Sequence, residues 1–118
     1  LFLLVWGLAS KGEEQPPVRR AGLVRFEPAA GTVFVRQGAI AVELGFGYDG
    51  ELSVNNRPIP DDQVDRIAGI NRLSFTPGPG KELEALPEGR NCVSVTFWTT
   101  AAGRESAGRP FSWCFTAA

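Results

Sequence analysis

Histidine and methionine are both absent from the 118 residues of this chain. Histidine is the side chain whose ordinary pKa suits general acid–base chemistry near neutral pH, and the two residues supply most imidazole and soft ligands to transition metals. Without histidine, a Ser-His-Asp hydrolase is excluded. We therefore expect a protein that is not an enzyme and that holds no cofactor.

Cysteine is scarce, and the charges nearly cancel. The two cysteines are too few for a zinc site made of cysteine alone, and carboxylates would have to complete the shell, so a disulfide is the favoured use. Twelve basic and thirteen acidic residues give a net charge of -1. Such a balanced chain lacks the basic surface on which nucleic-acid binding depends, and we expect no nucleic-acid partner.

The first ten residues are all apolar or small. A helix of this length spans about 15 Å, half of a bilayer core, and cannot cross a membrane alone. Residues 1–10 therefore fit part of a transmembrane helix that acts as a membrane anchor, or the remnant of a signal peptide; a strand or core helix is the third alternative. Residues 11–21 are charged and contain Pro16 and Pro17, which is typical of a stalk.

From residue 22 to residue 118, short alternating runs are separated by glycine, proline, asparagine and aspartate. This pattern predicts an all-β fold, an immunoglobulin-like antiparallel β-sandwich of about seven strands. Asn55 and Asn56 tolerate positive φ and predict a tight reversal, and residues 81–86 fit one turn of helix. Alternation in the first half assigns these apolar residues to the core face: Val24, Phe26, Ile40, Val42, Leu44, Phe46, Leu52 and Val54.

The last two strands are the most informative part of the sequence. Alternating apolar residues define their core face, which leaves Cys92 and Cys114 together on the opposite face. Antiparallel pairing around a hairpin at Gly103 then puts the two cysteines directly opposite each other, close to disulfide range; two unrelated free thiols are the alternative. Such a disulfide adds about 3 kcal/mol in the chain-entropy model and implies an oxidising compartment. The core-facing residues are Val93, Val95, Phe97, Phe111, Trp113 and Phe115.

Residues 45–50 match the G-x-G-x-x-G pattern of dinucleotide-binding loops. That fingerprint needs a helix to follow, whereas residues 51–55 are typical of a strand, so we interpret the motif as a glycine-rich loop with an exposed aromatic residue. Trp98 falls on the outward face with Cys92, and Tyr48 and Phe34 are expected to be partly exposed. These three are the candidate interaction residues, with packing as the alternative, which for Trp98 means covering the disulfide.

Asp61, Asp62 and Asp65 are the candidate ligands for a Ca²⁺ ion. Their spacing follows no calcium-loop pattern, and the alternative is a capped turn whose charge is balanced by Arg57 and Arg66. No metal site is therefore predicted. Nor do adjacent carboxylates on a turn make a catalytic pair, because nothing buries them to separate their pKa values.

Several segments, in their order along the chain, resemble the bacterial immunoglobulin-like modules of surface-layer and copper-resistance proteins. The resemblance covers residues 22–117 and implies a β-sandwich without a particular activity. Copper-binding members use histidine and methionine, so their metal function is not expected here, and the pair of Cys92 and Cys114 departs from most of these modules. The segments are residues 26–31 (FEPAAG), 40–44 (IAVEL), 52–56 (LSVNN), 73–77 (LSFTP), 86–89 (LPEG) with 93–95 (VSV), and 111–116 (FSWCFT).

These observations lead to an expectation about function. We expect a non-catalytic, membrane-anchored domain on the extracytoplasmic side of the cell membrane, which serves as a protein-binding or structural accessory module of the bacterial cell envelope. Its protein partner is expected to be a larger integral membrane complex, with residues 1–10 in the membrane. The alternative is a small-ligand module that binds a glycan or Ca²⁺ through Asp61, Asp62 and the loop around Tyr48.

Overall fold

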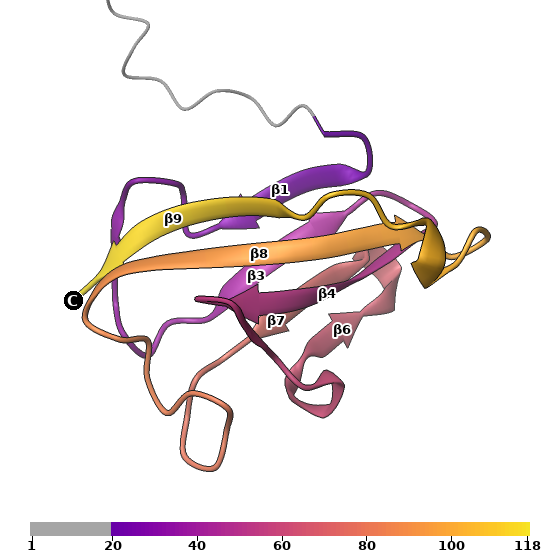
Figure 1. Ribbon diagram of the computed structural model, residues 1–118. Coiled ribbons are helices and arrows are strands. Elements are labelled where there is room, and N and C mark those ends of the chain that lie inside the picture. Colours follow the sequence, from indigo (N-terminus) through magenta and orange to yellow (C-terminus); the bar gives the residue numbers. More distant parts are fainter. Residues whose placement is uncertain (1–19) are drawn as a thin grey trace, which may run out of the picture.

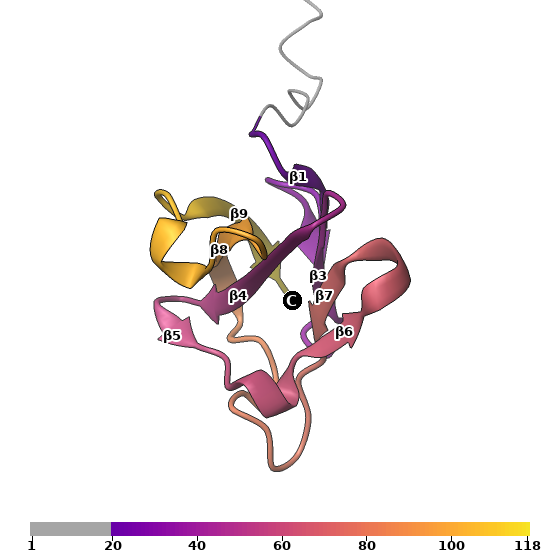
Figure 2. The same cartoon turned by 90° about the vertical axis from the view of Figure 1, so that its right-hand side faces the viewer.

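The structure, a computed structural model, describes residues 20–118, and the predicted anchor or signal remnant (1–10) and most of the predicted stalk (11–19) lie outside the described residues. Two sheets pack face to face (Figure 1), and the view along the strands separates them into two layers (Figure 2). Among residues 20–118, no helix is long and apolar enough to span a membrane. The predicted all-β sandwich is confirmed.

The sandwich contains nine strands in place of the predicted seven, because two of them are only two residues long. Neighbours pair antiparallel except β2 and β9, which run parallel, so the expectation of a wholly antiparallel sandwich is wrong at this edge. The four-stranded sheet has the order β1 (Leu23–Glu27), β3 (Ile40–Leu44), β7 (Arg72–Phe75) and β6 (Asp65–Ile67). The five-stranded sheet has the order β2 (Val33–Phe34), β9 (Phe111–Ala117), β8 (Gly89–Thr99), β4 (Tyr48–Val54) and β5 (Arg57–Pro58). Short 3-10 helices are η3 (Asp61–Gln63), η4 (Ala68–Ile70) and η5 (Arg104–Ser106).

Strand alternation produces most of the core between the sheets, although two predicted core residues are exposed. Val24 is 45% exposed because the register of β1 against β3 shifts between Leu23 and Arg25, which turns Leu23 inward instead. Phe46 is fully exposed because β3 ends at residue 44 and the chain turns before the alternation can continue. The predicted core residues that are confirmed as buried are Ile40, Val42, Leu44, Leu52, Val54, Val93, Val95, Trp113 and Phe115. Phe26, Phe97 and Phe111 are partly buried against them.

The β8–β9 hairpin has the predicted register, and Cys92 and Cys114 form a disulfide with sulfurs 2.01 Å apart. The two cysteines do not exchange backbone hydrogen bonds with each other. The Cys92 carbonyl accepts from Asn55 N at 2.8 Å, and the Cys114 carbonyl accepts from Gly31 N at 2.8 Å. They therefore occupy a non-hydrogen-bonded pair, the position at which opposite Cα atoms approach most closely, here 4.0 Å. The disulfide ties two strands of one sheet together on its outer face.

Asn55 and Asn56 form the predicted reversal between β4 and β5, with φ of 52° and 66°. The Asn55 side chain also joins this turn to β8, since its Oδ1 accepts from Cys92 N at 2.9 Å and its Nδ2 donates to Asn91 Oδ1 at 2.9 Å. Asn91 is completely buried, and its Nδ2 donates to the carbonyls of Pro87 and Gly89. A buried amide with its polar atoms satisfied in this way fixes the start of β8.

The predicted helical turn at residues 81–86 is wrong, because the structure has no helix there. The backbone groups of Leu86 pair with a distant residue instead of with their own turn. Its N–H donates to the Arg36 carbonyl at 2.8 Å, and its carbonyl accepts from Arg36 Nε at 2.9 Å. These contacts hold Leu86 in the core, where it is 0% exposed.

Replacing both Cys92 and Cys114 by serine should lower the free energy of unfolding by about 3 kcal/mol, because the disulfide closes a 22-residue separation in the unfolded chain. Urea denaturation of the full chain with and without the substitutions measures this difference. Thiol titration of the untreated native protein should find no free thiol. Two reactive thiols in the absence of reductant would contradict the disulfide.

Replacing Asn91 by alanine should cost about 2 kcal/mol of stability, because the carbonyls of Pro87 and Gly89 and the amide of Asn55 lose a buried partner. The matched control is Arg90→Ala at the exposed neighbouring position, which should change stability by less than about 0.5 kcal/mol. Equal urea midpoints for the two variants would show that the amide network does not hold β8.

Candidate functional site

One end of the sandwich, on the right of Figure 1, gathers the β3–β4 turn (45–47), the β6–β7 connection (68–71) and the β8–β9 connection (100–110). We call these three segments the loop end. Hydrogen bonds join them: Asn71 Nδ2 donates to the Gly45 carbonyl at 2.7 Å, and Thr100 N donates to the Gly47 carbonyl at 2.8 Å. Gly45 N also donates to the Gly22 carbonyl at 2.8 Å. The first strand therefore begins at the loop end.

The exposed aromatic residue of the glycine-rich segment is Phe46, and Tyr48 is not in that loop. Phe46 is 100% exposed at the tip of the β3–β4 turn, between Gly45 and Gly47. Two further apolar side chains of the same end, Ile67 and Ile70, are 50% and 49% exposed. Because β4 begins directly after the turn, no helix follows the G-x-G-x-x-G motif, as the sequence indicated. Alternation alone had assigned Phe46 to the core and so missed the most exposed aromatic residue.

Tyr48 opens β4 and is half-buried against its neighbours. Its ring lies edge-on to Phe97, with centroids 6.0 Å apart. It also lies directly over Gly22, where an added Cβ would come within 2.5 Å of the ring. The absence of a side chain at Gly22 therefore leaves the space that the Tyr48 ring occupies. Gly22 also has φ of +91°, a conformation that favours glycine.

Trp98 is on the outward face of β8, as predicted, but only 8% of it is exposed. The β8–β9 connection lies beside it, and the Arg104 guanidinium stands 4.9 Å from the ring centroid. Arg104 in turn forms an ion pair with Glu51. Six residues of strand separate Trp98 from Cys92, about 20 Å, so Trp98 does not cover the disulfide.

Phe34, the third candidate interaction residue, is in β2 at the opposite end of the sandwich. It is half-buried, and its ring meets that of Phe115 edge-on at 5.9 Å. The structure therefore brings Tyr48 close to Phe97, next to Trp98, and keeps Phe34 apart from them. Binding by any of the three stays a prediction.

A groove of about 220 Å³ opens beside Tyr48 at the loop end. Ile67, Ala68 and Leu73 supply apolar walls, and Asn71 and Thr100 contribute polar groups. Sequence reasoning missed this groove, because its walls come from three strands, β4, β6 and β7, and two connections that only the folded chain brings together.

Arg66 and Asp49 lie at the polar side of the groove. The Arg66 guanidinium donates to the Gly50 carbonyl at 3.0 Å and pairs with Asp49 and with Asp61 at 3.4 Å each. The charges at this side are therefore largely matched within the domain.

The candidate calcium ligands do not form a site. Asp61 and Asp62 are in η3, which confirms the predicted turn, but no side chain caps it, and all three aspartates are exposed. Asp61 pairs with Arg66 as the alternative interpretation required, whereas Arg57 pairs with Glu82 at 3.2 Å. Within residues 20–118, no group of three or more acidic or cysteine side chains is placed to hold a metal ion.

Comparison with known proteins shows the fold and not a family. No protein-family model matches the chain, and a search of curated proteins finds no match. Among solved structures, CopC from Methylosinus trichosporium OB3b aligns with a TM-score of 0.57 and 13% identity over 83% of this chain and 93% of that one. PcoC, a methionine-rich copper resistance protein from Escherichia coli, aligns with a TM-score of 0.53 and 16% identity over 85% of this chain and 100% of that one. The chain is similar to both in its β-sandwich.

Millimolar Ca²⁺ or Cu²⁺ should leave the melting temperature of the full chain unchanged within about 1 °C, because a ligand stabilises a fold only when it binds the native state. The chain has no histidine or methionine for copper, and Asp61 is already paired with Arg66. The double variant Asp61→Asn, Asp62→Asn should respond in the same way. A rise of several degrees that this variant abolishes would establish a calcium site at η3.

Proposed function

We propose that this chain is a non-catalytic accessory module of the bacterial cell envelope, which binds or braces a membrane protein complex on the extracytoplasmic side of the cell membrane. Residues 1–10 would hold it there. The observation that carries the proposal is the groove beside Tyr48, which is at the end where the first strand begins. Residues 1–19 would form a tether, with residues 1–10 in the membrane. Because this tether enters the domain at the loop end, it would bring the groove close to proteins of the same membrane.

The disulfide supports a location outside the cytoplasm. Disulfides form and persist in oxidising compartments and are rare where cellular thiol systems keep cysteines reduced. Cys92 and Cys114 occupy directly opposite positions on the outer face of one sheet, both of them partly exposed. A bond in this position favours a compartment without a reducing pool.

The size and lining of the groove favour a protein side chain as its occupant. Small-molecule sites usually measure about 300–1,000 Å³, and this groove is smaller. Its volume suits one aromatic or aliphatic side chain of a partner, and such buried anchors supply much of the energy of protein interfaces. The Tyr48 ring, Ile67 and Leu73 would surround that anchor, with Asn71 and Thr100 at the rim.

A second candidate function is the binding of a glycan in the same groove. The observation in its favour is the set of polar groups on Asp49, Asn71 and Thr100 beside the Tyr48 ring. Asp49 is already paired with Arg66, which reduces the polar capacity left for a sugar. The copper resistance role of PcoC is not proposed for this chain, because the chain has neither methionine nor histidine.

Purification of the full chain in mild detergent from native membranes should recover one integral membrane complex with it. The variant Ala68→Arg puts a long side chain at an exposed wall of the groove and should reduce recovery of that complex about tenfold, equivalent to roughly 1.4 kcal/mol of binding. The matched control is Ala30→Arg, at an exposed turn outside the groove, which should have no effect.

A chain that runs as a lone monomer would contradict the proposal, and so would equal recovery with both variants. Release of the complex by cell-wall sugars, with the control variant behaving like the unchanged chain, would favour the glycan candidate instead.

A further inference from the structure

We propose that the loop end rests on the lipid surface of the membrane, with Phe46 and Ile70 entering the headgroup region. The inference rests on the membrane tether of the proposed function and goes beyond it, since it names lipid as a second contact. It also fixes which way the domain stands on the membrane.

Phe46 and Ile70 are placed as tips and not as parts of a flat patch. Phe46 has no cover at all, and the glycines on both sides of it let the turn project the ring away from the sheets. Gly47 has φ of +83°, a conformation that glycine adopts at little cost. Ile70 precedes Asn71, whose side chain donates to the Gly45 carbonyl, so the two tips belong to loops that are bonded together.

The Phe46 ring is fully exposed, so contact with an apolar layer would remove its apolar surface from water, which is favourable. A protein interface usually surrounds such an anchor with contacts that exclude water. Here the two tips stand on separate loops, and the groove takes up the surface beside them. Separate apolar tips suit a lipid layer, because a fluid layer adapts to their shape. Aromatic and aliphatic side chains of membrane-bound proteins insert in this way at the boundary between headgroups and acyl chains.

The position of the tether agrees with this orientation. Gly22 is bonded to Gly45, one residue from Phe46, so the chain enters the domain beside the tip. Residues 11–19 reach at most about 30 Å when fully extended. The opposite end, which carries the exposed Val33 and Val35, lies roughly 35 Å away along the eleven residues of β8. The tether therefore brings the loop end to the bilayer more easily than the far end.

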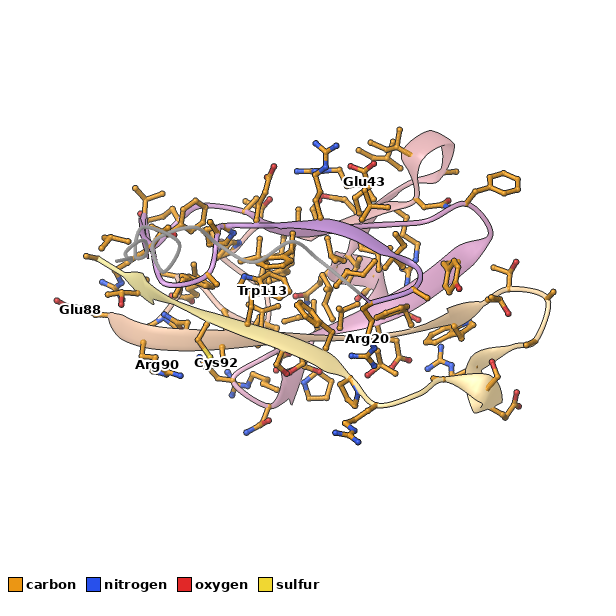
Figure 3. The ribbon with its side chains drawn as sticks, turned by 90° about the horizontal axis from the view of Figure 1, so that it is seen from above. Arg20, Glu43, Glu88, Arg90, Cys92 and Trp113 are labelled. Carbon is orange, nitrogen blue, oxygen red and sulfur yellow. A yellow bond between two sulfur atoms is a disulfide. The ribbon has the colours of Figure 1, made fainter. Side chains whose placement is uncertain are left out.

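Arginines at the same end add a weaker contribution. The Arg20 guanidinium lies 5.5 Å from the centroid of the Phe97 ring and donates to the carbonyl of Arg109 (Figure 3 labels Arg20). Arg109 belongs to the β8–β9 connection, so this contact is at the loop end. Guanidinium groups near a bilayer are attracted to anionic headgroups. Glu105 in η5 opposes them. We therefore expect the apolar tips to supply most of the binding energy for the membrane, and the charge of the lipid headgroups to contribute less.

The test uses the full chain reconstituted into phosphatidylcholine–phosphatidylglycerol vesicles and nanodiscs, with a gadolinium chelate on a fraction of the lipid headgroups. Flotation of the vesicles first shows whether the chain is held by the membrane. The line widths of backbone amide signals in NMR spectra of the nanodisc sample are then compared with and without gadolinium. We expect several-fold stronger broadening at residues 45–47 and 70 than at Val33 and Val35.

Two matched variants make the result specific. Phe46→Ser with Ile70→Ser should remove most of the difference between the two ends, while Val33→Ser with Val35→Ser should leave it unchanged. All four positions are exposed, so melting temperatures should stay within about 1 °C of the parent.

The experiment separates failure of the membrane tether from failure of the lipid contact at the loop end. A chain that does not float lacks the tether, which overturns the proposed membrane attachment and this inference together. A chain that floats while both ends broaden equally, or while the double serine variant at the tips keeps the full effect, overturns the inference and leaves the tether standing. Broadening at the loop end that appears only when the native protein complex is added would assign the tips to a protein contact and overturn the lipid contact.

Discussion

The register of the β8–β9 hairpin determines how the core and the loop end are put together. Strand β8 is the longest in the domain and pairs with β9 on one side and β4 on the other, so its register decides which residues of three strands face the core. The disulfide between Cys92 and Cys114 and the buried side chain of Asn91 both hold β8 near its start. At its other end β8 leads into the loop end, where Thr100 bonds to the turn that carries Phe46. A shift of one residue would turn the core outward and separate these loops.

The sequence was informative where two independent signals agreed on the same geometry. Alternation of apolar residues and the opposition of the two cysteines both predicted the final hairpin, and both are confirmed. Prediction failed where alternation met a turn or a bulge, as at Phe46 and Val24, because period-two patterns carry no information about where a strand ends. The cover over Trp98 and the groove beside Tyr48 depend on loops distant in sequence, which no local pattern reports.

The fold itself does not determine what the domain does. CopC and PcoC share its β-sandwich at 13% and 16% identity, yet this chain has no methionine, whereas PcoC is methionine-rich. β-Sandwiches serve many functions because proteins that share this fold carry different side chains in their loops. In this chain the distinctive side chains gather at the loop end: an uncovered phenylalanine, two half-exposed isoleucines and a groove of one side chain's size. The far end has exposed valines but no comparable combination among the residues that the structure describes.

We propose that the loop end is the working surface of the domain and that it faces the membrane to which residues 1–10 would attach the chain. Hydrogen–deuterium exchange tests it most directly, by comparing the full chain in native membranes with the same chain extracted into mild detergent. We expect slower exchange in membranes at residues 45–48, 67–71 and 100–103, with residues 33–36 and 87–90 unchanged as an internal reference. Protection confined to the far end, or no difference at the loop end, would contradict it.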